Sequence, residues 1–303
     1  MITLTGKRVS EGIAIGKISF YKRDQKDIRK ISVKDVEKEV SRYIKAKERA
    51  ISELDELYLM ATRDVGDANA MIFETQKKLI EDPDISDEIQ KRILNEEINA
   101  EFIIQEIIDS YISDTKKRGK DSLATHEADV RDAFTRLIRI LQHTFKERII
   151  YDEPFVMAAD EIYPSEILQF DKSKILGFIT TAGTLNSHTS VLARTKGIPS
   201  IIGVGESLKE EYDGKSVIID GFTGKIYIEP DYTTLTKFRK KRDSNLNYRK
   251  NLEKLKGKEN VTQSGQRIAV LANVANREDI ESVLRSDAGG IGLYRTEFLF
   301  MEN

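Results

Sequence analysis

Apolar positions recur along the chain with two different periods, and the change of period divides the chain into parts. Residues 1–21 carry short apolar runs interrupted by glycine, a pattern typical of β-strands. From Val33 to Leu57 apolar residues recur every three, four or seven positions, which predicts an amphipathic helix of about seven turns. Ser32 followed by Asp35 resembles a capping box at the start of that helix.

The helical period continues to about residue 147. A second helix is predicted through Met71–Ile80, ending near Asp82-Pro83 because the residue before proline disfavours the helical conformation. Since no strand pattern interrupts residues 33–147, this part of the chain is predicted to be a block of helices. Three more helices are expected within it: after Ser86, after Asn99 as N-cap, and along Val130–Leu141.

Strand patterns return after Pro154. One helix interrupts them, from about His188 to Lys196, with Gly197 just past its end and Pro199 two positions further. The strands at the N-terminus are expected to join this second group in one sheet, so that the helical block is an insertion. The predicted strands are Phe155–Ala158, Ile175–Thr180, Ser200–Gly203, Ser216–Ile219 and Lys225–Ile228.

The remaining residues predict a helical connector and the start of another domain. Residues 231–257 are highly charged with a few apolar positions at helical spacing. Two strands, Arg267–Ala272 and Gly290–Leu293, follow with a short helix between them. Two βα units cannot close a core alone, so we expect the tail to be the opening of an incomplete TIM-type barrel.

Composition excludes several classes of function. The 49 Lys and Arg residues nearly balance 51 Asp and Glu residues, so nucleic-acid binding is not expected. The chain has no cysteine, which excludes thiol catalysis and cysteine-ligated metals within it. There is no signal-peptide pattern and no apolar run of about 18 residues, which predicts a soluble cytoplasmic protein that does not bind a membrane.

His188 is the strongest candidate for chemistry, because it begins a helix that follows a strand and a glycine turn. The first helical turn offers free N–H groups and the positive end of the helix dipole, which together bind phosphate. A neutral imidazole nitrogen is a competent nucleophile toward phosphorus. A capping or packing role for His188 stays open on these grounds. Phosphate-positioning groups are expected at Gly183, Ser187, Thr189, Ser190 and Arg194.

The stretch Ser187–Arg194, followed by Gly197–Gly203, resembles the phosphohistidine site of the phosphoenolpyruvate-utilising enzymes. Other stretches resemble one branch of that family, Enzyme I of the bacterial sugar phosphotransferase system, a phosphoenolpyruvate–protein phosphotransferase. They are Glu11–Gly16, Ile72–Glu74 with Leu79–Pro83, Ala128–Asp132, and Gly290–Leu299, and they cover the chain in order.

The resemblance implies a fold and a division into domains. A swivelling β/α phosphohistidine domain would comprise residues 1–21 and 148–230, and a helical carrier-docking domain, residues 22–147, would be inserted into it. A helical linker, 231–260, would lead to the truncated start of a phosphoenolpyruvate-binding barrel, 261–303. The chain would thus combine α/β and all-α parts. Because the family forms dimers through the barrel, we expect a monomer.

The resemblance also implies roles for residues. His188 would carry the phosphoryl group and exchange it with the phosphocarrier HPr, and Arg295 would hold the phosphate of phosphoenolpyruvate in an intact protein. Mg²⁺ is expected only with the rest of the barrel; this chain is predicted to hold no cofactor or metal and to be unable to use phosphoenolpyruvate by itself. The carrier would dock on Phe73, Glu74, Lys78, Leu79, Glu81, Asp82 and His126.

Several positions depart from the family pattern. Thr184 and Leu185 stand where the family has glycine and arginine, and Ile167 stands where it has a threonine that contacts the histidine. We therefore expect His188 to be oriented differently, or by Thr181 or Asn186. On the docking side, Lys77 and Lys78 replace apolar residues and His126 replaces an arginine, which favours an HPr-like variant as partner.

The other candidates receive structural interpretations. His143 is expected to be packed or near a helix C-terminus, and His126 to touch the partner, reach the His188 phosphate or lie on the surface. Asp129, Arg131 and Asp132 are predicted to form an internal ion-pair network and not a metal site.

Two other functions stay open. One is the phosphohistidine domain of a phosphoenolpyruvate synthase or pyruvate phosphate dikinase, although residues 33–147 lack a nucleotide loop. The other is a non-catalytic regulatory binder of an HPr-like carrier, which Leu185 and Ile167 would suit. Neither the pathway served nor whether Asn303 is a natural end follows from these residues.

Overall fold

The computed structural model describes most of the 303 residues. It leaves out residues 24–26, 118–122, 144–152, 172, 275–277 and 295–303. The side chains of residues 114–117, 123–126, 278, 281–282 and 285 are also not described. Among the described residues, no helix combines the length and apolar character that crossing a membrane requires.

In the described part of the chain, eight strands form one mixed sheet with the order β1-β8-β7-β3-β4-β5-β6-β2. Strands β3, β4, β5 and β6 run parallel, and the remaining neighbours pair antiparallel. The N-terminal strands thus join the later ones, as predicted. The strands are β1 (Ile2–Thr5), β2 (Lys7–Ser10), β3 (Ile13–Phe20), β4 (Phe155–Ala159), β5 (Ile175–Thr180), β6 (Ser200–Ile202), β7 (Ser216–Asp220) and β8 (Lys225–Ile228).

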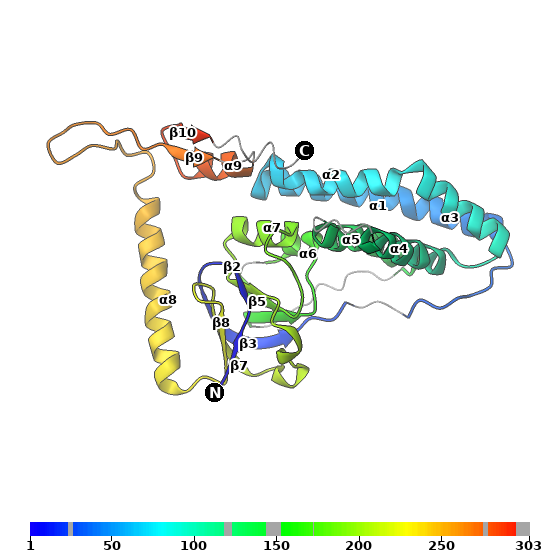
Figure 1. Cartoon of the computed structure of the whole chain (residues 1–303), viewed down its shortest axis with the longest axis horizontal. Helices are drawn as coiled ribbons and strands as arrows, with labels where there is room; N and C mark the ends of the chain where they lie inside the picture. The colour runs from blue at the N-terminus through cyan, green and yellow to red at the C-terminus, as the bar shows by residue number, and fades with distance from the viewer. Residues whose placement is uncertain (24–26, 118–122, 144–152, 172, 275–277, 295–303) are drawn as a thin grey trace.

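Among the described residues between β3 and β4, five helices pack side by side as a separate layer (Figure 1). Parallel pairing of β3 with β4, which brings Lys17 opposite Phe155, closes the sheet across this insertion. We call these helices the helical unit. They are α1 (Val36–Val65), α2 (Asp67–Glu81), α3 (Pro83–Glu96), α4 (Ala100–Lys117) and α5 (Leu123–Leu141).

The apolar core runs without a break from the helical unit to the sheet. Alternate residues of β4 point to opposite faces: Phe155 and Met157 join the core shared with the helical unit, whereas Val156 and Ala158 join a second core on the other face. Helices α6 (Pro164–Gln169) and α7 (His188–Lys196) contribute Ile167 and Leu192 to the shared core. The helical unit is therefore held against α6 and α7 by apolar packing.

The last part of the chain leaves this body. Helix α8 (Tyr232–Glu253) buries only Phe238 of its described side chains, with Lys241 paired to Asp220 at 3.1 Å. Beyond it, β9 (Ala272–Val274) and β10 (Ile291–Tyr294) pair in parallel across α9 (Glu278–Arg285). The predicted strand at 267–272 therefore begins later, at Ala272.

Helix α2 ends at Glu81, just before Asp82-Pro83, as predicted, but α3 begins earlier than the predicted start after Ser86. Pro83 is the first residue of α3, where its missing N–H costs nothing, and Asp82 caps that helix. Asn99 accepts a hydrogen bond from Ile31 N–H at 2.9 Å, while the Ala100 N–H at the start of α4 is bound by Glu39 Oε1 at 2.8 Å. The six-residue helix α6 was not predicted, because a single short run carries no clear period.

Helix α1 is capped by Asp35 and not by Ser32. The Asp35 Oδ1 accepts a hydrogen bond from Lys38 N–H at 3.0 Å, whereas Ser32 forms a backbone bridge with Ile98. We expect Asp35→Ala to lower the free energy of unfolding by about 1 kcal/mol in urea denaturation. Ser32→Ala is the matched control and should leave it nearly unchanged; an equal loss in both variants would contradict the assignment.

An ion-pair cluster ties α1 to α4. Burial alone would raise the pKa of Glu101, but hydrogen bonds from Arg42 at 2.8 and 2.7 Å, together with one from Asn99, hold it below its ordinary value of 4.5. A carboxylate with a lowered folded-state pKa stabilises the fold above its unfolded pKa, and that contribution is lost as pH falls through the folded pKa.

The urea midpoint should therefore decrease between about pH 6 and about pH 3.5, and part of that decrease should come from Glu101. We expect Glu101→Gln to be less stable than the wild-type chain at the higher pH but to lose less stability on acidification. Parallel curves for the two proteins would show that Glu101 does not contribute to the acid sensitivity.

Candidate functional site

Helix α7 begins at His188, as predicted, because of local capping. Ser187 is the N-cap, and its Oγ accepts a hydrogen bond from Ser190 N–H at 3.2 Å. Gly197 ends the helix in the left-handed conformation at φ 63°, which glycine adopts without strain. His188 thus lies in the first turn, at the positive end of the helix dipole.

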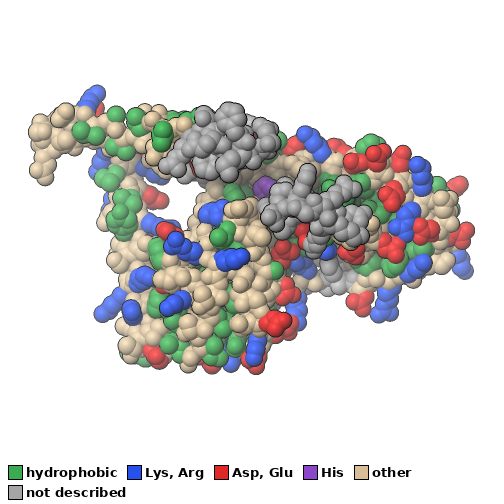
Figure 2. Space-filling view, in the orientation of Figure 1, with side chains coloured by type: hydrophobic (Ala, Val, Ile, Leu, Met, Phe, Trp, Pro, Cys, Tyr) green, Lys and Arg blue, Asp and Glu red, His purple; other side chains and the backbone are tan. Residues whose placement is uncertain are grey.

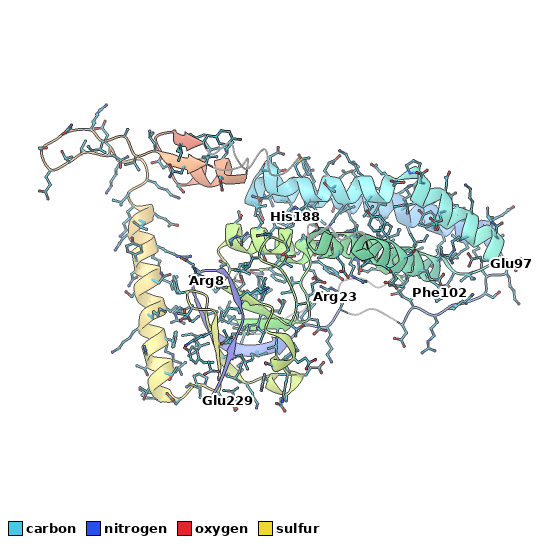
Figure 3. The ribbon with its side chains drawn as sticks, viewed as in Figure 1. Arg8, Arg23, Glu97, Phe102, His188 and Glu229 are labelled. Carbon is cyan, nitrogen blue, oxygen red and sulfur yellow. The ribbon has the colours of Figure 1, made fainter. Side chains whose placement is uncertain are left out.

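The imidazole of His188 is held by a carboxylate of the helical unit. Its Nδ1 lies 2.8 Å from Oδ2 of Asp129, which comes from α5 and is 59 residues away in the sequence. The Asp129 side chain is 7% exposed, whereas that of His188 is 36% exposed. Figure 3 shows His188 at α7, on the side facing α2.

This contact determines which ring nitrogen is reactive. An ionised carboxylate only accepts hydrogen bonds, so Nδ1 carries the proton and donates it to Asp129. In the neutral imidazole, Nε2 then holds the lone pair and is the nucleophilic atom. The same carboxylate stabilises the positive charge that develops on the ring when Nε2 forms a new bond.

Asp129 was not predicted as a partner of His188. It was assigned to an internal ion-pair network with Arg131 and Asp132, and the structure corrects this. Asp129 binds His188, Arg131 binds Glu127 at 3.2 Å, and Asp132 accepts hydrogen bonds from Ser165. The signal available in the sequence was the Ala128–Asp132 stretch. Asp129 and Asp132 are three residues apart, so in a helix they lie on one face.

Of the predicted alternatives, the contact with Asp129 agrees with a His188 that is oriented differently from the family pattern, and not with orientation by Thr181. Thr181 donates its hydroxyl proton to Asp160 O at 3.1 Å, and the Ile167 side chain is completely buried in the core. Asn186 is exposed, and the Nδ1 of His188 is already engaged by Asp129. An acidic residue from another element replaces the missing threonine hydroxyl.

The predicted phosphate-binding hydroxyls instead hold the loop and helix together in this arrangement. Thr189 donates to Ile162 O at 2.8 Å, Ser190 donates to Thr184 O at 2.7 Å, and Ser187 donates to Thr184 O at 3.0 Å. All three residues are at most 8% exposed. Their hydroxyl protons are used within the protein.

Two other predicted positions also shape the loop before His188. Arg194 turns back as expected, but its Nη1 donates to Leu185 O at 3.0 Å. Burial lowers the pKa of Arg194. Gly183 has φ 121°, a conformation that other residues rarely adopt, so a side chain there would strain the turn after β5.

The predicted docking residues fall into two groups. Phe73 is completely buried in the helical unit, so its side chain supports α2 from inside and is not available to a partner; that part of the prediction is wrong. Lys78 and Glu81 are exposed, and Glu74, Leu79 and Asp82 are half-buried. Figure 2 shows acidic and basic side chains interspersed over the helical unit.

The structure describes only some of the contacts of the remaining predicted residues. The Asp82 carboxylate is engaged as the cap of α3, accepting hydrogen bonds from Asp84 N–H and Ile85 N–H. Lys77 forms an ion pair with Asp55 at 2.7 Å. His143 lies exposed just after α5, near its C-terminus. The side chain of His126 and the whole of Arg295 lie outside the described residues.

No metal site accompanies His188 in the described part of the chain, where no three His, Cys, Asp or Glu side chains are grouped to hold an ion. The described site therefore consists of an oriented imidazole, a buried carboxylate and a helix N-terminus. This set suits covalent attachment of a phosphoryl group, since such transfer depends on positioning and charge stabilisation.

Comparison with protein families finds three consecutive matches. The model for the PEP-utilising enzyme N-terminal region matches residues 5–125, and the model for the PEP-utilising enzyme mobile domain matches residues 151–224. The model for the PEP-utilising enzyme PEP-binding domain matches residues 249–303. His188 and α7 fall within the mobile-domain match.

Curated relatives that share one name, phosphoenolpyruvate-protein phosphotransferase, match almost the whole of this chain. Phosphoenolpyruvate-protein phosphotransferases of Staphylococcus carnosus and Bacillus sp. (strain S) are 29% and 32% identical over 98% and 99% of this chain. Each match covers 52% of the relative, so the chain spans about half the length of the curated relatives it matches.

Solved structures share the fold. The NMR solution structure of Enzyme I (nEIt) is 28% identical, with a TM-score of 0.63 over 80% of this chain and 99% of that one. A structure of the N-terminal domain of Enzyme 1 - Nitrogen, at 19% identity and TM-score 0.54 over 78% of this chain and 98% of that one, supports the fold alone.

Proposed function

The chain belongs to the PEP-utilising enzymes, and from this premise we propose that His188 accepts a phosphoryl group on Nε2 and exchanges it with an HPr-like phosphocarrier. The observation that supports this most is the 2.8 Å contact between His188 Nδ1 and Asp129 Oδ2. It leaves Nε2 unprotonated on an imidazole that is partly open to solvent.

The transfer step balances without an external acid or base. The lone pair of His188 Nε2 attacks phosphorus on the carrier's phosphohistidine, and a new P–N bond forms. The P–N bond to the carrier breaks, and its electron pair returns to the carrier imidazole. The His188 ring gains positive charge while its Nδ1 proton stays on the hydrogen bond to Asp129, whose carboxylate offsets that charge.

Docking is proposed on the exposed side of α2, the side that carries Lys78 and Glu81. Lys78 and Glu81 present charged groups there, close in sequence to the half-buried Glu74 and Leu79. Interspersed charges of both signs favour a carrier surface with complementary charges, and such charges affect the rate of association and the choice of partner more than affinity. A sugar phosphotransferase role follows from the relatives' names and belongs to this proposal.

In the whole protein, phosphoenolpyruvate would be the first donor, with Mg²⁺ bound outside the residues described here. Among the described residues, no three metal ligands are grouped. We expect the 303-residue polypeptide alone to gain no mass from phosphoenolpyruvate and Mg²⁺.

The test is intact mass spectrometry after mixing the chain with phosphorylated HPr, with unphosphorylated HPr as control. We expect an acid-labile gain of one phosphoryl group, because an N-linked phosphoryl group is lost in acid. Binding without any mass gain would overturn phosphoryl transfer and favour a non-catalytic carrier binder. If the chain neither bound HPr nor gained mass, the choice of HPr as the carrier would be overturned.

A further inference from the structure

A glutamine of α2, Gln76, is buried inside the helical unit and faces α5. Gln76 is 1% exposed. Its Nε2 donates to the backbone oxygen of Asp129 at 3.3 Å and to Oδ2 of Asp132 at 3.2 Å. Its Oε1 is buried and accepts no hydrogen bond from any described residue.

This arrangement is not explained by stability. A buried amide with one unsatisfied oxygen costs free energy that a methionine of similar length would not. The amide orientation is determined by its surroundings, since reversing it would place Oε1 against the Asp132 carboxylate. Gln76 therefore acts as a donor toward α5.

The two acceptors of Gln76 lead directly to the site. Asp129, whose backbone oxygen Gln76 binds, holds the His188 ring with its carboxylate. Asp132 lies one turn further along α5 and accepts hydrogen bonds from Ser165 N–H at 3.0 Å and Ser165 Oγ at 2.6 Å. One network thus joins α2, α5, α6 and α7.

The distances suit a link that responds to small movements. The two Gln76 bonds, at 3.2 and 3.3 Å, are longer than the usual 2.9–3.0 Å, whereas the Ser165 Oγ bond is short at 2.6 Å. A shift of α2 toward or away from α5 changes the Gln76 bonds first, while Asp132 stays fixed to α6.

We propose that Gln76 is a positioning residue that couples docking on α2 to the orientation of His188 through Asp129 and Asp132. The coupling rests on the proposed function, because it assumes that the carrier docks on α2. Gln76 does not touch the reacting atoms; it acts through α5, and a partner that moves α2 changes how firmly Asp129 holds the imidazole.

The test is Gln76→Met, examined by nitrogen NMR of the His188 ring and by single-turnover transfer from phosphorylated HPr. We expect a smaller population of the Nδ1–H tautomer and a transfer rate lowered roughly three- to tenfold, as for loss of one hydrogen bond. The affinity for the carrier should be unchanged. The urea midpoint should be unchanged or higher. Ser165→Ala interrupts the same network at α6 and should shift the His188 signals in the same direction.

The matched control is Asn69→Leu, which also removes a buried amide from α2. Asn69 is 7% exposed, and its Nδ2 bonds locally to Val65 O at 2.8 Å. We expect this variant to leave the His188 spectrum and the transfer rate unchanged.

If Gln76→Met left the tautomer population of His188 and the transfer rate unchanged, the proposed coupling would be overturned. It would also be overturned if Asn69→Leu changed both quantities as much as Gln76→Met does. If the wild-type chain gains no phosphoryl group from the carrier, the proposed function fails separately, since the imidazole spectrum needs no carrier and still tests the link between Gln76 and His188.

Discussion

Replacement of His188 by alanine is expected to abolish the acid-labile mass gain from phosphorylated HPr. The residue supplies the Nε2 lone pair that forms the new P–N bond, and no other described nucleophile occupies that place. Carrier binding should remain, because the docking side of α2 is left intact. The measurement is intact mass before and after acid treatment, together with a binding titration.

Loss of transfer in that variant must be separated from damage to the fold. Alanine removes the hydrogen-bond donor to Asp129, whose side chain is 7% exposed. His188→Gln is the matched control, because its amide keeps an N–H donor but cannot form the acid-labile phosphoryl linkage. A mass gain that persists in both variants would refute His188 as the acceptor and redirect attention to His126 or His143.

Asp129→Asn is expected to slow transfer by about 10²- to 10³-fold without changing carrier affinity. The asparagine amide can donate to Nδ1, which stabilises the tautomer with the proton on Nε2 and removes the nucleophilic lone pair. The neutral amide also does not offset the charge that develops on the ring. The rate is measured in single turnover, and the tautomer by nitrogen NMR of the imidazole.

Glu127→Gln provides the control for Asp129→Asn, since it removes a carboxylate from the same helix. Glu127 pairs with Arg131 at 3.2 Å. We expect the transfer rate of that variant to stay close to wild type. A normal rate in Asp129→Asn would mean that the contact with Asp129 does not orient His188 for reaction, even if His188 still carries the phosphoryl group.

The position of His188 at the start of α7 could be predicted from residues close to it in the sequence. The strand and glycine turn before His188, with Gly197 and Pro199 after the helix, predicted the bounds of α7, and the structure confirms them. These signals are local, because capping and the left-handed turn involve residues within one helical turn. The amphipathic period likewise predicted the existence of α1, α2, α4 and α5, while the start of α3 was predicted after Ser86 and lies at Pro83.

The family resemblance also came from the sequence, since it depends on residues in order and not on their positions in space. The three family matches, at residues 5–125, 151–224 and 249–303, agree with it. The domain boundaries and the roles of the docking residues stay predictions, because neither a sequence pattern nor a single chain shows what a partner touches.

Contacts between distant segments were decided only by the tertiary structure. Asp129 meets His188 across 59 residues, and Gln76 reaches Asp132 across 56. No periodicity links such pairs. Asp129 meets His188 because parallel pairing of β3 and β4 returns the chain to the sheet after the helical insertion, where the helices share one apolar core with α7. Gln76 meets Asp132 because α2 and α5 pack into that same core within the helical unit.

The sequence by itself thus predicted most of the helices and strands, the candidate histidine and the family. Only the tertiary structure decided which nitrogen of His188 faces Asp129, that the Ser187, Thr189 and Ser190 hydroxyls are turned inward, and that Phe73 is buried. The physical reason is the range of the forces. Propensity and capping act within a turn, whereas burial and hydrogen-bond partners depend on every element that packs against a residue.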